Sequence, residues 1–323
     1  MITHRLTKAM AFGCVASAIA CAAVAQSYPV KPVRMIVASS AGSNPDTAGR
    51  VFANGLSQQL GQQVIVDNRA GAGGNIGAEV AAKAAADGYT IFFAHTNHSI
   101  NPGLYKKLNY DVLTDFSPVT LVASSAFVVV VHPSIPAKSV RDLLNIARAR
   151  PDDLNYASAG TGSGTFFGAE YFKGMGNVKM VHVPYTGGGP ALASILAGET
   201  SVYFSPVPTG LPHIRSGRLR ALGVTARQRL PELPEVPPIA ETLKGYELMS
   251  WGGLVAPAKT PKEITDTLHK ASLAVLTKPD VVKRLQDLGF IVMTSRPDEM
   301  TAYVRTEIDK YSKLIRQIGL PPQ

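Results

Sequence analysis

The chain has 323 residues, of which 46% are hydrophobic and 17% charged, and its formal net charge is +9. This length and apolar fraction exclude a disordered chain and a small disulfide-stapled domain, and they leave room for two lobes. The basic residues are scattered, without runs or interleaved aromatic side chains, so no nucleic-acid-binding stripe is indicated. The net charge favours encounters with anions, although solvated surface side chains account for it equally well.

The first 25 residues have the pattern of a secretory signal peptide. Arg5 and Lys8 form a basic region, residues 9–25 carry no charge, and Ala23-Val24-Ala25 has the shape of a signal peptidase site. The uncharged run is shorter than the ~20 residues that a membrane span needs. Cleavage after Ala25 would leave 298 of the 323 residues and, without Arg5 and Lys8, a net charge of +7. We therefore expect a periplasmic protein.

Both cysteines, Cys14 and Cys21, lie in this segment, so the mature chain would contain no thiol and no Cys-ligated metal. A lipoprotein anchored at Cys21 remains an alternative. The residues before it, Ala18-Ile19-Ala20, lack the leucine that is usual in a lipobox.

From residue 33 onward, β-branched runs alternate with amphipathic stretches, which is typical of parallel strands joined by crossover helices. The first part of the chain predicts strands at 33–39, 63–68 and 90–95 and helices at 47–60 and 78–86. A long β-rich stretch at 119–132 follows. The second part predicts helices at 139–150, 165–175 and 191–197 and strands at 154–158, 180–184, 201–205 and 221–225.

A proline-rich segment at 230–238 is predicted to be a surface loop. A second long β-rich stretch at 247–256 precedes a mainly helical end, with helices at 261–276, 279–288 and 297–318 and a short strand at 290–294. The two long stretches are predicted to cross between lobes, which makes the first lobe discontinuous. We expect one domain of residues 26–124 and 252–323 and a second of residues 125–251.

Three loops of small residues follow predicted strands, at 39–46, 159–165 and 185–190. Each could expose backbone N–H groups at a helix N-terminus, where unpaired donors and the positive end of the helix dipole favour a carboxylate or phosphate. One such loop is weak support, because glycines also form tight turns. Three loops at the carboxyl ends of parallel strands would border one crevice, and they predict an anion-binding site.

Catalytic and cofactor-binding patterns are incomplete. The glycines of 71–77 suggest a dinucleotide fingerprint, but Ile76 stands where the third glycine belongs. Ser163 is not in a G-x-S-x-G elbow. His95 and His98 lie at a strand end without a nearby carboxylate, so no metal is expected, and we expect no cofactor. An exported α/β enzyme that acts on an acidic substrate remains the alternative to a binding protein.

Four further side chains have two interpretations each. Phe166 and Phe204 could form an apolar wall for a ligand or belong to the core. Tyr185 could contact a ligand or pack between the lobes. Asp46 could cap its helix or hold the preceding loop, since a carboxylate that faced an anionic ligand would repel it.

Motifs along nearly the whole mature chain indicate a known family: Tyr28-Pro29, Val64-x-Val66-Asp67-Asn68-Arg69, Ser158-Ala159-Gly160-x-Gly162-Ser163, His182-Val183-Pro184-Tyr185-x-Gly187 and Trp251-x-Gly253-Leu254-x-Ala256-Pro257. The sequence resembles the substrate-binding proteins of tripartite tricarboxylate transporters, the Bug family, named after Bordetella uptake genes. The resemblance implies an α/β fold of the type II periplasmic binding proteins, a venus flytrap in which each lobe is a mixed sheet flanked by helices.

The resemblance also implies a function without covalent chemistry. A monomeric protein would capture a small organic carboxylate, either a di- or tricarboxylate or an aromatic acid, between its lobes and deliver it to membrane permease subunits. Main-chain N–H groups, hydroxyls and bridging waters would hold the carboxylate. Carried onto this chain, the ligand-binding residues would be Ser40, Gly42, Ser43, Asn44, Thr96 and Asn97 from the first lobe and Ser158, Gly160, Gly162, Ser163, Tyr185 and Thr186 from the second.

The chain departs from the family pattern at two places. The first loop usually carries Gly-Gly after a Pro-Phe pair, whereas here Gly42-Ser43 follows Ala38-Ser39, and Phe166 stands where a histidine is common. The added hydroxyls of Ser39, Ser40 and Ser43 lead to the hypothesis that the pocket recognises a second polar group. The loss of a titratable side chain at position 166 would favour an apolar ligand body.

Overall fold

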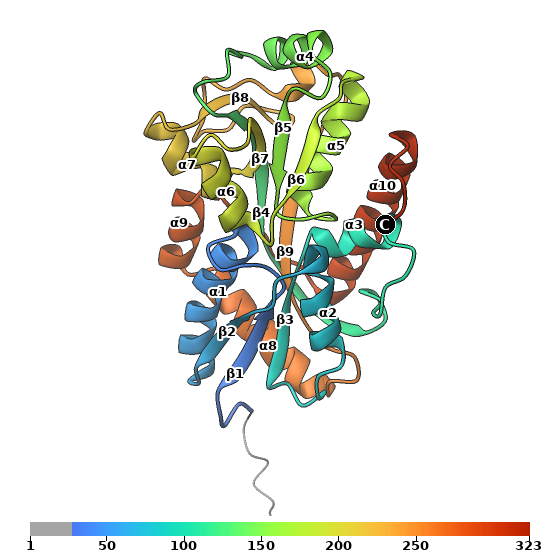
Figure 1. Cartoon of the computed structure of the whole chain (residues 1–323). Helices are drawn as coiled ribbons and strands as arrows, with labels where there is room; N and C mark the ends of the chain where they lie inside the picture. The colour runs from blue at the N-terminus through green and yellow to red at the C-terminus, as the bar shows by residue number, and fades with distance from the viewer. Residues whose placement is uncertain (1–27) are drawn as a thin grey trace, which may run out of the picture.

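The strands of the described part of the chain, residues 28–323, join in one hydrogen-bonded sheet that runs through both lobes of this computed structural model (Figure 1). The predicted signal peptide lies outside the described residues. The strand order is β2-β1-β3-β9-β4-β7-β5-β6, with β8 and β10 paired to β4. The strands are β1 (Val33–Val37), β2 (Val64–Asn68), β3 (Thr90–His95), β4 (Phe116–Val131), β5 (Asn155–Ser158), β6 (Val181–Pro184), β7 (Val202–Pro206), β8 (Arg220–Val224), β9 (Met249–Pro257) and β10 (Ile291–Val292).

The first lobe contains β1, β2 and β3, which are parallel, and β9, which is antiparallel to β3. In the second lobe, β5 is parallel to β6 and β7, whereas β7 and β8 are antiparallel to β4. Each lobe therefore has the expected mixed sheet. Helices cover the sheet in both lobes: α1 (Asn44–Leu60), α2 (Asn75–Ala82), α3 (Asn97–Leu104), α4 (Val140–Ala149), α5 (Gly164–Gly176), α6 (Gly188–Leu196), α7 (Val207–Arg215), α8 (Lys262–Leu276), α9 (Pro279–Asp287) and α10 (Pro297–Gln317), with short 3₁₀ turns η1 (Ala72–Gly74) and η2 (Ile239–Glu241).

The long strand β4 passes through both lobes. Every residue from 119 to 131 is buried, as expected for an apolar strand that is covered on both faces. Its first part pairs with β9 and its last part with β7 and β8. The two β-rich stretches predicted at 119–132 and 247–256 thus lie side by side and connect the lobes.

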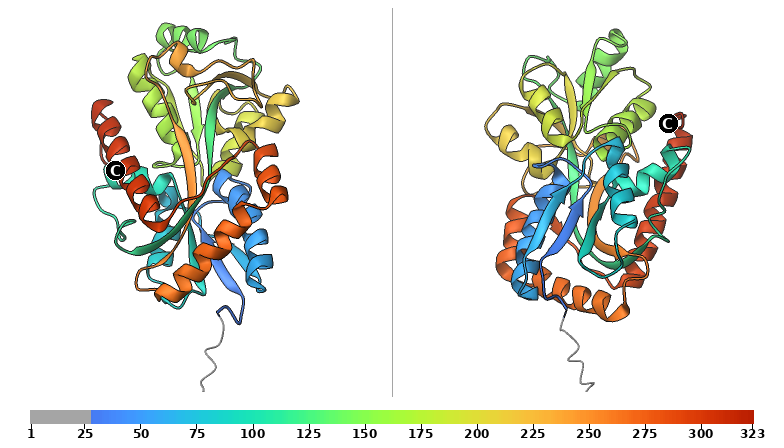
Figure 2. Two further views of the ribbon diagram at one scale, coloured as in Figure 1. Left: turned by 180° about the vertical axis from the view of Figure 1, so that it is seen from behind. Right: turned by 60° about the horizontal axis from the view of Figure 1, so that its bottom comes forward.

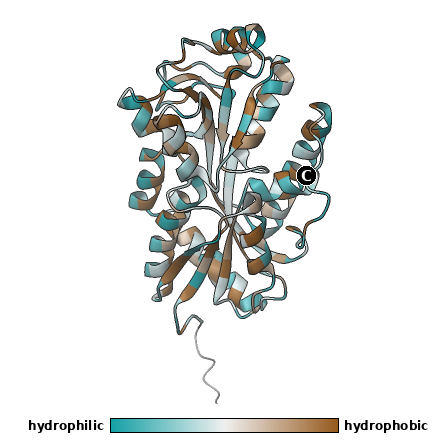
Figure 3. Cartoon of the chain, in the orientation of Figure 1, coloured by the Kyte–Doolittle hydropathy of each residue, from teal (hydrophilic) through white to brown (hydrophobic). Residues whose placement is uncertain are grey.

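Local sequence patterns account for most helices. In α4, Val140, Leu143, Leu144 and Ala147 form a buried stripe with helical spacing, and the Ser139 side chain accepts a hydrogen bond from Asp142 N (3.1 Å) at the start. Figure 3 shows the same pattern more widely, with hydrophobic residues in the strands and alternating hydrophobic and hydrophilic residues along the surface helices. No helix within residues 28–323 is long and apolar enough to cross a membrane.

The C-terminal helices α8, α9 and α10 lie across the back of the molecule (Figure 2). The first turns of α10 pack on the first lobe through Met300 and Val304. Its last turns join the core of the second lobe, where the ring of Tyr311 lies edge-on to Phe167 at a centroid distance of 5.1 Å. One helix therefore contributes to the cores of both lobes.

Two helices, α3 and α7, were not predicted. Pro102 lies inside α3, and Pro208 and Pro212 lie in α7. Because proline lacks an N–H and clashes with the preceding turn, these stretches are typical of loops in a sequence. Both helices are short and begin directly at the end of a strand, so the strand positions them. β10, predicted at 290–294, is only two residues long.

Candidate functional site

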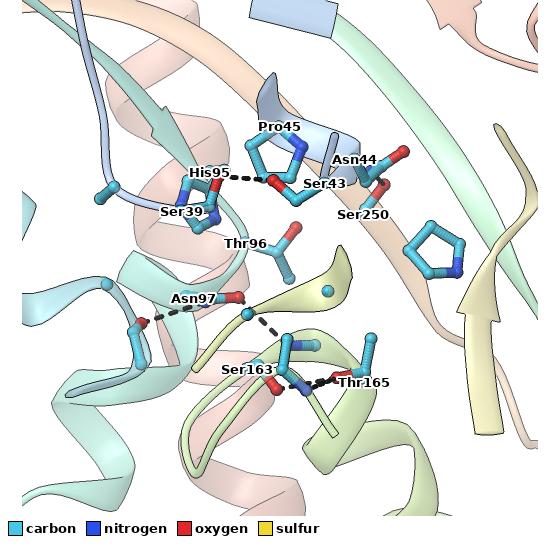
Figure 4. Close-up of a pocket in the computed structure, with 18 of the residues that line it drawn as sticks. Ser39, Ser43, Asn44, Pro45, His95, Thr96, Asn97, Ser163, Thr165 and Ser250 are labelled. Carbon is cyan, nitrogen blue, oxygen red and sulfur yellow. Dashed lines mark hydrogen bonds between the residues drawn. The ribbon is translucent and has the colours of Figure 1, made fainter. Parts of the chain in front are cut away.

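A cavity of about 310 Å³ lies between the two lobes (Figure 4). Its walls come from the loops at the carboxyl ends of the parallel strands in both lobes and from the crossing strands β4 and β9. At ~30 Å³ per water molecule, this volume equals about ten waters, which suits a small organic molecule. Aromatic side chains form part of its wall: Phe93, Phe127, Tyr185, Tyr203, Trp251 and Phe290.

Four helices begin at the cavity wall, two from each lobe. Their first residues line it: Ser43 and Asn44 of α1, Thr96 and Asn97 of α3, Ser163 and Gly164 of α5, and Gly187 and Gly188 of α6. The first turn of a helix carries unpaired N–H groups and a partial positive charge. Among the described residues that line the cavity, none is Lys, Arg, Asp or Glu. Its electrostatic character therefore comes from helix ends and neutral polar groups, which suits an anion.

The protein itself already binds some of these N–H groups. At the start of α5, Gly164 N donates to Asn97 Oδ1 (3.1 Å), and Phe166 N donates to Ser163 Oγ (3.2 Å). In contrast, the side chain of Ser43 gives α1 no cap, because its hydroxyl pairs with Ser39 Oγ (2.7 Å). The N-cap of α6 is Gly187, which has no side chain. The ends of α1 and α6, from opposite lobes, therefore remain open to a ligand.

Asp46 is the one carboxylate in the first turn of α1, and it faces away from the cavity. Its side chain is 3% exposed and accepts hydrogen bonds from Gly42 N (2.8 Å), Asn68 Nδ2 (2.8 Å) and Arg50 Nε (3.0 Å). It holds the loop before α1, which is one of the two roles expected from the sequence. With Arg50 beside it, its negative charge is balanced outside the cavity.

The lobes touch each other around the cavity. Asn97 of α3 donates to Gly73 O (3.0 Å) within the first lobe while its Oδ1 accepts from Gly164 of the second. Tyr105 OH donates to Thr161 O (3.1 Å), again from the first lobe to the second. The two lobes are therefore in direct contact beside the cavity.

The start of α1 is also tied to the crossing strands. Asn44 Nδ2 lies 3.2 Å from both Ser125 Oγ of β4 and Ser250 Oγ of β9, and these two hydroxyls are 2.7 Å apart. Thr96 Oγ1 accepts from Trp251 N (2.7 Å) in a similar way. These contacts fix two of the helix N-termini relative to the strands that connect the lobes.

Two buried histidines lie next to the cavity. His95 N donates to His98 Nδ1 (3.0 Å), and the two rings are 4.4 Å apart. Burial lowers the pKa of His98 to about 4 and lowers the pKa of His95 well below its usual value; the neighbouring His98 adds to the effect on His95, and the Ala38 backbone opposes it. Both rings are therefore neutral near pH 7. No group of three His, Cys, Asp or Glu in residues 28–323 could hold a metal.

Another histidine, His182, supports the start of the 159–165 loop through Ser158. Ser158 Oγ pairs with His182 Nε2 (2.6 Å) and accepts from Gly160 N (3.1 Å). The ring of Phe166 packs against His182 at 4.8 Å and does not line the cavity. The expectation that Phe166 shapes the ligand body is therefore wrong: Phe166 and Phe204 both belong to the core.

The predicted site residues fall into two groups. The structure places on the cavity wall Ser43, Asn44, Thr96, Asn97, Gly160, Ser163, Tyr185 and Thr186. Four others, Ser40, Gly42, Ser158 and Gly162, do not line this cavity. Of these, Gly42 is exposed and lies in a separate hollow beside α1 and α9. Ser40 packs against Gly187, and Gly162 packs against Asn101 and Tyr105 across the lobe interface.

Sequence reasoning missed several wall residues. His95 was considered only as a metal ligand, although its place at the carboxyl end of a parallel strand would have pointed to the crevice. Ser250 and Trp251 come from β9, and Trp251 lies 155 residues from its hydrogen-bond partner Thr96 in the sequence, so no local pattern indicates this proximity.

A fold of two α/β lobes linked by crossing strands, with an anion-suited cavity between them, defines the class of periplasmic solute-binding proteins. The sequence pattern of the tripartite tricarboxylate transporter family receptors, TctC, matches residues 48–320. The chain belongs to this family of transporter receptors and is a binding protein, not an enzyme.

Solved structures of relatives have the same fold. An R. palustris protein, Rpa4515, described with adipate, is 34% identical with a TM-score of 0.89, over 92% of this chain and 100% of the other. The periplasmic binding protein BugD is 31% identical with a TM-score of 0.89, over 92% and 100%. MatC from Rhodopseudomonas palustris, described with bound malate, is 30% identical with a TM-score of 0.85, over 89% and 100%. Homologues of this chain are thus periplasmic proteins that bind carboxylates.

Proposed function

We propose that this receptor captures a small organic carboxylate, a di- or tricarboxylate or an aromatic acid, in the cavity between its lobes and delivers it to the membrane permease subunits of a tripartite tricarboxylate-type transporter. It would act as a monomer in the periplasm after cleavage of residues 1–25. The observation that carries this proposal is the cavity wall, where four helix N-termini meet without a charged side chain.

The uncapped ends of α1 and α6 are the proposed anchor for one carboxylate. They come from different lobes, so an anion between them contacts both lobes only when these are closed, and this favours the closed form. Ser43, Asn44, Thr186 and Gly188 lie beside this point. The other polar wall residues, Thr96, Asn97, Gly160, Ser163 and Tyr185, would surround the ligand directly or through water.

The apolar part of the wall would contact the ligand body. Phe93 and Phe290 come from the first lobe and Phe127 from the start of the second. The relatives described with adipate and malate support a ligand of this size and charge.

The two crossing strands are the proposed hinge between a domain of residues 26–124 and 252–323 and a domain of residues 125–251. Both proposed boundaries lie at one level of the sheet, because Ser124 pairs with Trp251 and Ser125 with Ser250. The pairing of β4 with β9 is irregular just before this level, between Leu121 and Ala123, where a bend in the strands is less costly.

The test is a thermal-shift screen of the mature protein, residues 26–323, against aliphatic and aromatic mono-, di- and tricarboxylates. Amino acids and inorganic phosphate serve as controls. A ligand at 100 times its Kd stabilises the native state by about 2.7 kcal/mol and raises Tm. We expect a shift for carboxylates alone, with the ligand recovered unchanged. The protein is first unfolded and refolded to remove any bound ligand. The proposal is refuted if phosphate or amino acids then raise its Tm and no carboxylate does.

A further inference from the structure

Ser158 holds two parts of the cavity wall in the second lobe. It ends β5 and is fully buried. Its hydroxyl oxygen accepts a hydrogen bond from Gly160 N (3.1 Å), and its carbonyl oxygen accepts one from Tyr185 N (3.0 Å). Gly160 and Tyr185 both line the cavity, whereas Ser158 does not. A change in the orientation of the Ser158 hydroxyl therefore reaches the wall through Gly160.

The Ser158 hydroxyl also has a proton to donate. Because the residue is not exposed to solvent, this proton needs an acceptor within the protein. Within residues 28–323, the hydroxyl has two hydrogen-bond partners: Gly160 N, which is a donor, and His182 Nε2, which lies 2.6 Å away. The proton therefore goes to His182, and Nε2 is the unprotonated nitrogen of that ring.

The surroundings of His182 keep its ring neutral and fix its plane. Burial lowers the pKa of His182; Glu170 opposes this effect and Lys173 adds to it. Glu170 and Lys173 form an ion pair with each other (2.6 Å), so their charges largely compensate. The imidazole stacks on Tyr156 at a centroid distance of 4.9 Å and packs against Phe166 at 4.8 Å. Near pH 7, Nε2 therefore carries no proton and can accept the hydroxyl.

The loop at 159–165 depends on this arrangement at its first turn. Gly160 has a φ of +102° and no side chain, so hydrogen bonds of its main chain hold its conformation. Its N–H donates to Ser158 Oγ, and its carbonyl accepts from Ser163 N (3.1 Å), another residue of the cavity wall. Without an acceptor at position 182, the Ser158 hydroxyl would turn towards another acceptor and leave Gly160 N without its partner.

We propose that His182 is a positioning residue for ligand binding: by accepting the Ser158 hydroxyl proton, it keeps the serine oxygen directed at Gly160 N and so holds the 159–165 loop ready for the ligand. This inference rests on the proposed function, because the loop borders the same cavity. His182 itself does not line the cavity, so it acts without touching the ligand. A preformed loop adds affinity because less order has to be gained on binding.

The experiment separates the acceptor of His182 from its ring. His182→Phe keeps the ring contacts with Tyr156 and Phe166 and removes the acceptor, whereas His182→Gln removes the ring and keeps an acceptor oxygen at a similar reach. Titration calorimetry near pH 7 measures Kd for adipate and malate, the acids with which two relatives are described. His182→Phe should raise Kd at least about fivefold, and His182→Gln should stay within about twofold of the wild type.

A double-mutant cycle tests whether His182 acts through Ser158. Ser158→Ala should raise Kd by a similar factor, and adding His182→Phe to it should change Kd by less than about twofold. His132→Phe is the matched control, because His132 Nδ1 pairs with Ser134 Oγ (2.7 Å) in a similar way and neither residue lines the cavity. This control should leave Kd unchanged.

Hydrogen exchange tests the same role without a ligand. The backbone amides of residues 158–166 should exchange faster in His182→Phe than in the wild type, and at nearly the wild-type rate in His182→Gln. The role of His182 is overturned if His182→Phe keeps the wild-type Kd and exchange rates. It is also overturned if His182→Gln is impaired as strongly as His182→Phe, since the ring contacts would then be decisive. If no carboxylate binds to the wild type, the proposed function itself fails, and the exchange rates still decide the role of His182.

Discussion

The two lobes approach each other closely at Gly73. A Cβ at this position would lie 2.5 Å from Thr161 O, 3.3 Å from Tyr105 OH and 3.4 Å from the Cα of Gly162. Thr161 and Gly162 belong to the second lobe and Gly73 to the first. Since the nearest atom is a backbone oxygen, a methyl group can be accommodated only if the lobes move apart. Gly73→Ala should therefore weaken ligand binding by opposing closure.

The chain offers a matched control at Gly61, which ends α1. Its φ of +67° is close to the +63° of Gly73, and a Cβ there would meet nothing within 4 Å. Both Gly→Ala changes carry the same left-handed backbone cost, about 1–2 kcal/mol. The difference between the two variants thus isolates the contact between the lobes.

The size of the effect follows from the cost of overpacking, about 1–3 kcal/mol. If the closed form loses ~2 kcal/mol relative to the open form, the apparent Kd rises about 30-fold. Titration calorimetry measures this Kd, and small-angle scattering shows whether saturating ligand still reduces the radius of gyration. The reasoning is refuted if Gly73→Ala and Gly61→Ala bind a carboxylate with Kd values within twofold of each other.

Three other predictions use the same assays. Asn97→Ala removes two hydrogen bonds that meet at the lobe interface, each worth ~1 kcal/mol, and should raise Kd by about fivefold or more. An unchanged Kd would show that closure of the lobes does not use these hydrogen bonds. Phe166→His should leave Kd unchanged and lower Tm, because the ring packs on His182 behind the wall, and a shift in ligand preference would contradict this. The pKa of His98 is about 4 in the folded protein and 6.5 in the unfolded chain, so between these pH values the unfolded chain binds more protons. The free energy of unfolding therefore falls with decreasing pH, by at most ~1.4 kcal/mol per pH unit. Denaturant unfolding of His98→Gln should show a shallower decline between pH 6.5 and 4.

The sequence predicted the alternation of strands and helices because periodicity is local. Strand β3 has the predicted bounds, and β4 was recognised from its long apolar run. The helices α3 and α7 were missed because their prolines disfavour helix locally, whereas the strands before them and the packing around them determine the structure. The three small-residue loops do lie at one cavity, since carboxyl ends of parallel strands share an edge.

The details of the site could not be predicted in this way. Glycine-rich loops show that N–H groups are available, but not which of them the protein already uses. Gly164 N is bound by Asn97, which is 67 residues away and in the other lobe. Ser158 belongs to a family motif, yet it does not line the cavity. Its hydroxyl pairs with His182 and accepts a hydrogen bond from Gly160 N, which holds the loop. Such assignments depend on long-range contacts that no local spacing encodes.

A cavity without charged side chains has a consequence for the conditions in which capture works. Attraction between full charges at a protein surface weakens as salt rises, because counter-ions screen it over about 10 Å at 0.1 M. If an anion binds as proposed, helix ends and amides of the cavity would lie at contact distance from it and out of reach of those counter-ions. The affinity should therefore change little between dilute and saline media, even where the rate of encounter with the basic outer surface falls. Release of such an anion would break no ion pair, so opening of the lobes would be enough to return it to water.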